Sequence, residues 1–154
     1  MPSRLAVLMP FPGTRVIPSG WQTYHRPVVE GTWTAWCTID GPGEGPGEWN
    51  DDTNEYDPPE RIVLHTQVPC RVQQHTLPQA ADVGTQQVSS HDYLVVVPAS
   101  ILDAAVDQHV TVTGSRDQMD PVDPSLIGRP LVVTDVQRGS LLWERDLVAI
   151  DNLG

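Results

Sequence analysis

Alternation of apolar and polar residues predicts short β-strands along most of the chain. The clearest stretch is 130–150, where a run rich in β-branched valines is followed by the turn residues Arg138-Gly139-Ser140 and a second alternating segment. In that second segment Leu147 and Ala149 share one face, and Val148 and Ile150 share the other. A strand that is partly apolar on both faces is typical of a sandwich, a small barrel or a subunit interface. We take this hairpin as the anchor of a small β-barrel.

Four more segments have strand patterns: Thr32–Asp40, Arg61–Gln73, His91–Pro98 and Asp107–Gly114. In the second of them the expected inward residues are Ile62, Leu64, Val68, Cys70 and Val72. Its Pro69 cannot donate a ladder hydrogen bond, so we expect an edge strand or a bend there. With the hairpin this makes about six strands, which predicts a mainly β fold, an antiparallel barrel or sandwich.

Helical signals are short. A helix is expected around Trp21–Arg26, ending before Pro27, because a proline biases the preceding residue away from helix. Ser100–Asp103 resembles the start of a helix of one or two turns. Asp123–Gly128 predicts a capped single turn, with Asp123 as cap and a proline at the first helical position.

The length of 154 residues fits one domain, and 15 Pro and 12 Gly disfavour a helical bundle. Two segments are expected to lie outside the barrel: a proline-rich, apolar N-terminal arm at 1–19 and an acidic loop at 41–60. The loop is long for a compact domain, which marks it as functional or disordered. The polar stretch 74–90 is a second long loop.

The net charge is −11, and seven acidic residues with no base fall between Glu44 and Glu60. Such a charge disfavours a protein that reads DNA sequence, although DNA could slide past an acidic surface without sticking. All nine basic residues are Arg. No apolar run reaches the ~18 residues of a membrane span, and the N-terminus has no secretory pattern. We therefore expect a protein used in the cytoplasm, or in a particle assembled there, with no membrane partner.

Catalytic and cofactor motifs are not found, so we predict no enzyme, no cofactor and no metal. Cys37 and Cys70 are expected to be buried, reduced packing residues, with a disulfide possible only if their strands are neighbours. A cupin-like metal enzyme is the alternative from another class, with His65, His91 and His109 as candidate ligands. A calcium site in the acidic loop is a further alternative, although the loop lacks the EF-hand pattern.

The remaining signal is that of an interaction protein. Five Trp are many for a chain with one Phe, and Trp is enriched in interface anchors. The candidate subunit-interface residues are Trp21, Trp33, Trp36, Trp143 and Arg145. The candidate docking or lumen residues, all in the acidic loop, are Glu44, Glu48, Trp49, Asp51, Asp52, Glu55 and Asp57.

Two stretches resemble a known family. They are Gly20-Trp21-Gln22-Thr23-Tyr24-His25-Arg26-Pro27-Val28-Val29-Glu30-Gly31-Thr32 with the strand after it, and the C-terminal third. In that third the similar segments are His109–Ser115, Asp123–Leu131 and Gly139–Leu147. These segments are similar to the head-to-tail stopper (head-closure, tail-completion) proteins of long-tailed actinobacterial phages. The absence of Lys fits their high-GC genomes.

The resemblance implies a β-barrel subunit of a ring, usually six-fold, in the virion neck. Such a ring lies below the portal and adaptor, retains the packaged DNA and docks the tail. The implied partners are further copies of the chain, an adaptor or portal-side protein, a tail terminator or tail tube, and DNA passing through the lumen. The arm at 1–19 and the insertion at 41–60 depart from the family's simpler pattern, so either 41–60 or 74–90 could gate the channel. Another neck ring protein, such as a tail terminator, is the close alternative.

Overall fold

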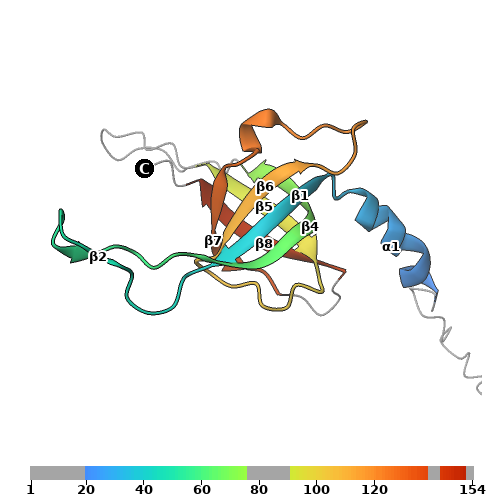
Figure 1. The fold of residues 1–154 in the computed structure, drawn as a ribbon. Coiled ribbons are helices and arrows are strands. Elements are labelled where there is room, and N and C mark those ends of the chain that lie inside the picture. Colours follow the sequence, from blue (N-terminus) through green and yellow to red (C-terminus); the bar gives the residue numbers. More distant parts are fainter. Residues whose placement is uncertain (1–19, 76–90, 139–142, 152–154) are drawn as a thin grey trace, which may run out of the picture.

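The protein forms a closed, antiparallel, six-stranded β-barrel (Figure 1), in a computed structural model that describes residues 20–75, 91–138 and 143–151. Around the barrel the strand order is β1-β4-β5-β8-β7-β6. The strands are β1 (Ala35–Gly41), β4 (Ile62–His75), β5 (Asp92–Pro98), β6 (His109–Ser115), β7 (Pro130–Val136) and β8 (Glu144–Asp151). The predicted mainly β class is confirmed, and the barrel is realised in place of the sandwich.

The predicted C-terminal hairpin is confirmed as β7 and β8. Val132 pairs with Ile150 and Val133 with Ala149, and a register shift follows Val133. Every second residue of β8 is buried, from Arg145 to Asp151, so the face that carries Leu147 and Ala149 points into the core. Gly139 and Ser140 of the expected turn lie outside the described residues.

The core is built from the inward faces of all six barrel strands, as the alternation predicts. The fully buried side chains are aliphatic residues and the two cysteines: Cys37, Ile39, Cys70, Val95, Val97, Val110, Val112, Leu131, Val133 and Leu147. Val96 is also fully buried although its neighbours Val95 and Val97 point inward, so the outer face of β5 is covered at this one position.

The first half of β4 differs from the prediction. Ile62 and Leu64 are 46% and 40% exposed instead of facing the core. Two register shifts interrupt the pairing of β1 with β4, and Gln67 adopts a left-handed conformation with φ of 51°. Val63, between Ile62 and Leu64, is 57% exposed as well, so both faces of this end of the 14-residue β4 lie outside the core, and the alternation could not reveal where the core ends. Val68 and Cys70, after the register shifts, are buried as predicted.

Pro69 lies next to a change of strand partner. β4 pairs with β1 over Ile62–Cys70 and with β5 over Arg71–His75. Because the barrel is closed, β4 is not an edge strand. The proline therefore lies just before the pairing with β5 begins, where its missing N–H breaks no bond to that strand.

The helical predictions have mixed outcomes. Helix α1 (Trp21–Gly31) continues through Pro27, and none of its residues is buried, so water can satisfy the carbonyl that the proline leaves unpaired. Ser100–Asp103 forms turns instead of a helix. The capped turn is confirmed as the 3-10 helix η1 (Pro124–Leu126), in which the Asp123 carboxylate accepts a hydrogen bond from the Ser125 N–H at 2.9 Å.

The two cysteines are free thiols, buried side by side on the neighbouring strands β1 and β4. A hydrogen bond with Cys70 and burial raise the pKa of the Cys37 thiol far above its usual range. The expectation of buried, reduced cysteines is confirmed.

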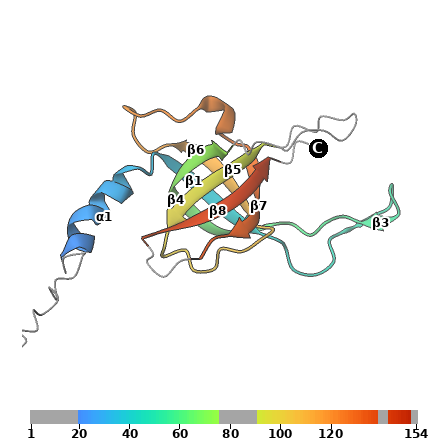
Figure 2. The same cartoon turned by 180° about the vertical axis from the view of Figure 1, so that it is seen from behind.

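Two segments extend away from the barrel, on opposite sides in both views (Figures 1 and 2). One is α1, and the other is the segment 42–60, which carries the short strands β2 (Trp49–Asn50) and β3 (Glu55–Tyr56). The predicted arm at 1–19 and most of the loop at 74–90 fall outside the described residues. Within the part that is described, no helix has the length and apolar character needed to span a membrane.

Candidate functional site

The segment 42–60, here called the acidic arm, is an ordered extension with its own hairpin. Its two sides run so close together that a Cβ on Gly47 would collide with the carbonyl oxygen of Asp57, and one on Gly43 with that of Glu60. The glycines of the Gly-Pro run are thus needed for close backbone approach. The sequence predicts a loop here and gives no sign of β2 and β3, because each has only two residues.

Side chains at the tip hold the hairpin together. The Trp49 and Tyr56 rings meet edge to face with centroids 5.0 Å apart, and the Trp49 indole N–H donates to the Asp51 carboxylate at 2.9 Å. The Asn50 side chain accepts from the Asp52 N–H at 3.0 Å and donates to the Asp57 carboxylate at 3.3 Å. Trp49 and Tyr56 nevertheless stay 48% and 62% exposed.

The acidic candidates all lie on this arm and all are exposed: Glu44, Glu48, Asp51, Asp52, Glu55 and Asp57. The structure therefore brings the predicted docking or lumen residues together on one projecting element. The partner that these residues would bind stays a prediction.

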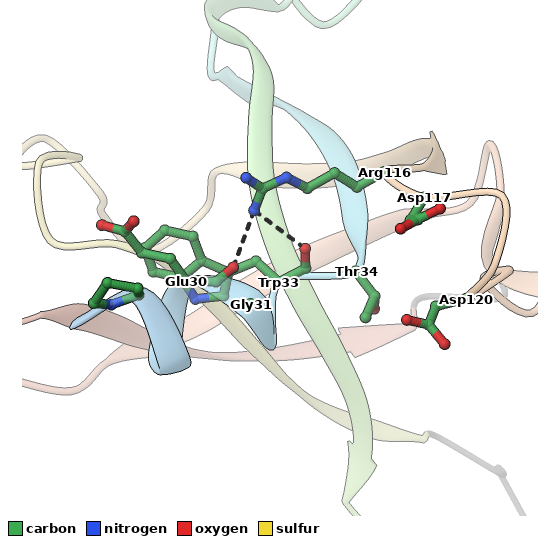
Figure 3. A pocket seen from close by; sticks show the side chains of 8 residues that line it. Glu30, Gly31, Trp33, Thr34, Arg116, Asp117 and Asp120 are labelled. Carbon is green, nitrogen blue, oxygen red and sulfur yellow. Dashed lines mark hydrogen bonds between the residues drawn. The ribbon is translucent and has the colours of Figure 1, made fainter. Parts of the chain in front are cut away.

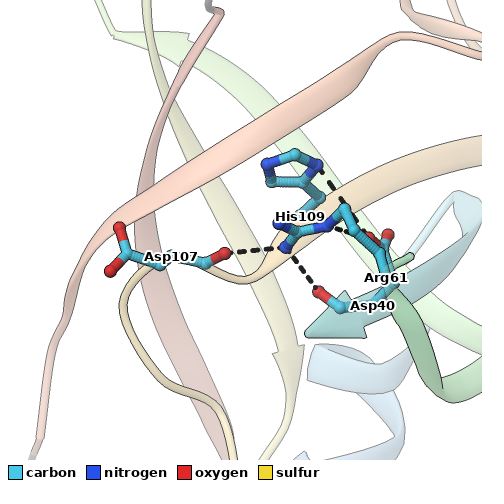
Figure 4. A network of polar contacts seen from close by, with 4 residues as sticks. All are labelled: Asp40, Arg61, Asp107 and His109. Carbon is cyan, nitrogen blue, oxygen red and sulfur yellow. Dashed lines mark hydrogen bonds and ion pairs between the residues drawn. The ribbon is translucent and has the colours of Figure 1, made fainter. Parts of the chain in front are cut away.

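Arg61 anchors the root of the acidic arm (Figure 4). Its guanidinium donates to the Asp40 carboxylate, to the Asp40 carbonyl at 3.2 Å and to the Asp107 carbonyl at 2.7 Å. His109 lies beside this group, with its Nδ1 3.9 Å from the Asp40 carboxylate. Burial and the Arg61 charge lower the pKa of His109, although Asp40 and Asp107 act in the opposite direction. One arginine thus joins the end of β1 and the start of β4 to the turn before β6.

Helix α1 is attached at its two ends. At the first residue, Trp21 stacks on Trp143 with centroids 4.8 Å apart, and on His25 at 4.5 Å. At the last turn, Arg116 donates to the carbonyls of Glu30 at 3.0 Å and Trp33 at 3.4 Å (Figure 3). The Arg116 guanidinium also lies 5.5 Å from the centre of the Trp36 ring, a cation–π contact.

An open hollow of about 400 Å³ lies beside this attachment, between the end of α1 and the segment after β6 (Figure 3). Its lining includes the carboxylates of Glu30, Asp117 and Asp120. Two of them already have partners in the chain: Glu30 bonds Arg26 at 2.8 Å, and Asp117 accepts from the Met119 N–H at 2.9 Å. The hollow is therefore best described as the gap where the helix joins the barrel.

The candidate interface residues divide into two groups. Trp21, Trp36 and Trp143 are half-buried and keep some surface for a neighbour. Trp33 and Arg145 are only 6% exposed, because the chain itself covers them. Little of either side chain is therefore accessible to another copy. The sequence could not separate the two groups, since inward and outward positions alternate along the same strand pattern.

The histidine candidates for a metal site come from different places. His65 on β4 bonds the Asp103 carboxylate at 2.7 Å, and this contact lowers the pKa of Asp103. His109 belongs to the Arg61 group, and His91 lies just before β5. Over residues 20–75, 91–138 and 143–151, no three His, Cys, Asp or Glu side chains gather as metal ligands.

Comparison with known proteins adds a family membership. No curated protein and no solved structure matches the chain. One family model covers residues 25–150, which is most of the sequence, from the middle of α1 to the second-last residue of β8. The chain therefore belongs to the family of unknown function DUF6093.

Proposed function

We propose that this protein is a structural ring subunit of a phage virion neck, a head-to-tail stopper. The observation that carries the proposal is a small closed barrel with two different extensions on opposite sides (Figures 1 and 2). A closed ring needs heterologous contacts, in which one surface of a subunit meets a different surface of the next. Two dissimilar extensions on opposite sides supply such a pair of surfaces.

The charge distribution supports the same role. The acidic arm carries carboxylates that are all exposed and that no base on the arm neutralises. Such an element would repel phosphate if it faced the lumen, so DNA could pass without binding. It would instead steer a basic partner surface if it faced the adaptor or the tail. The sequence resemblance to stopper proteins and the β-barrel that it implies agree with this function.

The test is to locate the chain in the particle. We expect mass spectrometry of purified virions to detect it and cryo-EM of the neck to place its barrel in a ring between the adaptor and the tail. We also expect particles that lack it to release their DNA from filled heads. A ring at the tail end of the neck would favour the tail-terminator alternative. A chain that is absent from virions and stays monomeric with portal and adaptor proteins would overturn the proposal.

A further inference from the structure

Helix α1 has an exposed face that the described part of its own copy leaves uncovered. Tyr24 and Val28, one turn apart, are 79% and 68% exposed, and no residue of the helix is buried. Isolated helices shorter than roughly 12–15 residues are only marginally stable in water, and α1 has 11. The contacts at its two ends hold it in place, but its middle has an apolar face that suits a partner.

The acidic arm, on the other side of the barrel, is likewise marginally stable by itself and exposes apolar side chains. A two-stranded hairpin is marginally stable on its own, and among the described strands β2 and β3 pair with each other alone. Its tip presents the edge-to-face pair of Trp49 and Tyr56, both exposed. Aromatic side chains of this kind are typical interface anchors.

The acidic arm lacks the base that α1 offers. Arg26 is the one arginine of α1 and is balanced within the helix by Glu30, whereas the acidic arm contains seven acids and no base. Arg26 bonds Glu30 through a pair whose side chains are 64% and 40% exposed, and exposed pairs of this kind exchange partners at little cost. Because α1 and the arm leave the barrel on opposite sides, they meet only if they belong to different copies (Figures 1 and 2).

We propose that the acidic arm of one copy docks on α1 of the next copy. The Trp49–Tyr56 pair packs on the Tyr24 and Val28 face, and the arm's carboxylates face Arg26. The contact is heterologous, so its repetition generates a ring if the rotation closes. This inference rests on the proposed function, because it names the contact that would build the neck ring.

Cross-linking between two distinguishable full-length chains tests the contact. One chain carries Tyr24→Cys and the other, made longer by a tag, carries Tyr56→Cys. The native cysteines are buried and do not interfere. On mild oxidation we expect a disulfide-linked band of mixed mass from the mixture, and no linked band from either chain alone. The control is Met119→Cys, an 86% exposed position on neither extension, which should link to neither chain.

Charge reversal gives an independent measurement. Arg26→Glu should weaken self-association about tenfold at low salt, as seen in sedimentation velocity. Mixing it with a copy that carries Asp52→Arg and Glu55→Arg should restore much of the loss. All three positions are exposed, so the variants should fold, which circular dichroism checks.

The outcomes separate the contact from the function. The contact is overturned if no mixed band forms, or if each chain alone gives a linked band. It is also overturned if the chain stays monomeric at the highest concentration. If the chain occupies a neck ring in which these residues do not meet, the contact fails and the stopper function stands. A mixed band from a chain that is absent from virions supports the contact and overturns the function.

Discussion

The indole of Trp21, at the first residue of α1, stacks on the indole of Trp143, directly before β8, with centroids 4.8 Å apart and planes inclined by 27°. This contact joins the far end of the helix to the connection between β7 and β8. Arg116 holds the near end through two carbonyl oxygens. The direction in which α1 projects is thus set by side chains from two distant parts of the chain.

Replacing Trp143 with Ala should release the far end of α1 and leave the barrel folded. An aromatic pair contributes about 0.5–1.5 kcal/mol beyond the area that it buries. We expect a loss of that order in the free energy of unfolding, and faster amide hydrogen exchange in α1. Trp49→Ala is the matched control at concentrations low enough to keep the chain monomeric, since it removes an indole from the other extension and should then leave exchange in α1 unchanged. Complete unfolding of the Trp143 variant would instead make this residue part of the core.

Leu147 and Val148 test the two faces of β8. Leu147 is fully buried and its neighbour Val148 is half-buried on the outer face. Leu147→Ala should cost about 2–5 kcal/mol in urea unfolding, as for other buried Leu to Ala changes. Val148→Ala should cost clearly less, because less of its side chain is removed from water. Equal losses would contradict the barrel register.

Arg61→Ala should loosen the root of the acidic arm. It removes the partner of the Asp40 carboxylate, whose side chain is 16% exposed, and the bond to the Asp107 carbonyl. Since the Arg61 side chain is itself 31% exposed, water screens part of the loss, and we expect about 1–2 kcal/mol. Arg138→Ala, at an exposed arginine after β7, is the control and should change stability by less than about 0.5 kcal/mol. Similar losses in both variants would show that Arg61 does not anchor the arm.

The lowered pKa of His109 should make the free energy of unfolding decrease in mild acid. Its pKa lies below the ordinary value of 6.5 in the folded state, so the unfolded chain binds the proton more readily. The stability that neutral His109 contributes is fully present above about pH 6.5 and is lost as pH falls toward the lowered pKa. Asp103 and Asp123, whose pKa values are also lowered, lose their contributions only below about pH 3.8.

The measurement is the free energy of unfolding between about pH 7.5 and 5, a range in which histidines titrate. His109→Asn should flatten the decline, whereas His75→Asn, at an exposed position, should leave it in place. A wild-type protein that becomes more stable over this range on acidification would contradict the placement of His109 beside Arg61.

The two thiols should report global unfolding. Cys37 and Cys70 are fully buried, and the raised pKa of Cys37 keeps it protonated. We expect neither to react with a thiol reagent at pH 8 in the native protein, and both to react in denaturant, because the thiolate is the reactive form. Rapid native labelling would show that β1 and β4 separate without global unfolding.

Alternation along the chain was sufficient to predict the class of fold, the strand hairpin at 130–150 and the buried faces of most strands. It failed at Ile62 and Leu64, because the apolar pattern does not show where a long strand leaves the core, and Val63 on the other face is exposed there too. It also ended the first helix at Arg26, because the bias before a proline is a preference that an exposed helix can override.

The sequence was sufficient to predict the negative charge of the candidate site, but it did not predict how its residues are arranged. The acidic run stands out in the sequence, but its short hairpin depends on contacts such as the pairing of Trp49 with Tyr56. The role of Arg116 was missed, because the carbonyls that it binds belong to Glu30 and Trp33, more than 80 residues away. Contacts of such long sequence separation leave no local pattern.

The strand order also determines when the barrel can form during synthesis. β8 lies between β5 and β7, so the barrel stays open along two sheet edges until residues 144–151 have left the ribosome. Exposed edges are templates for pairing with other chains. Many subunits made at once would pass through this open state together, so fast insertion of β8 protects the nascent protein from aggregation.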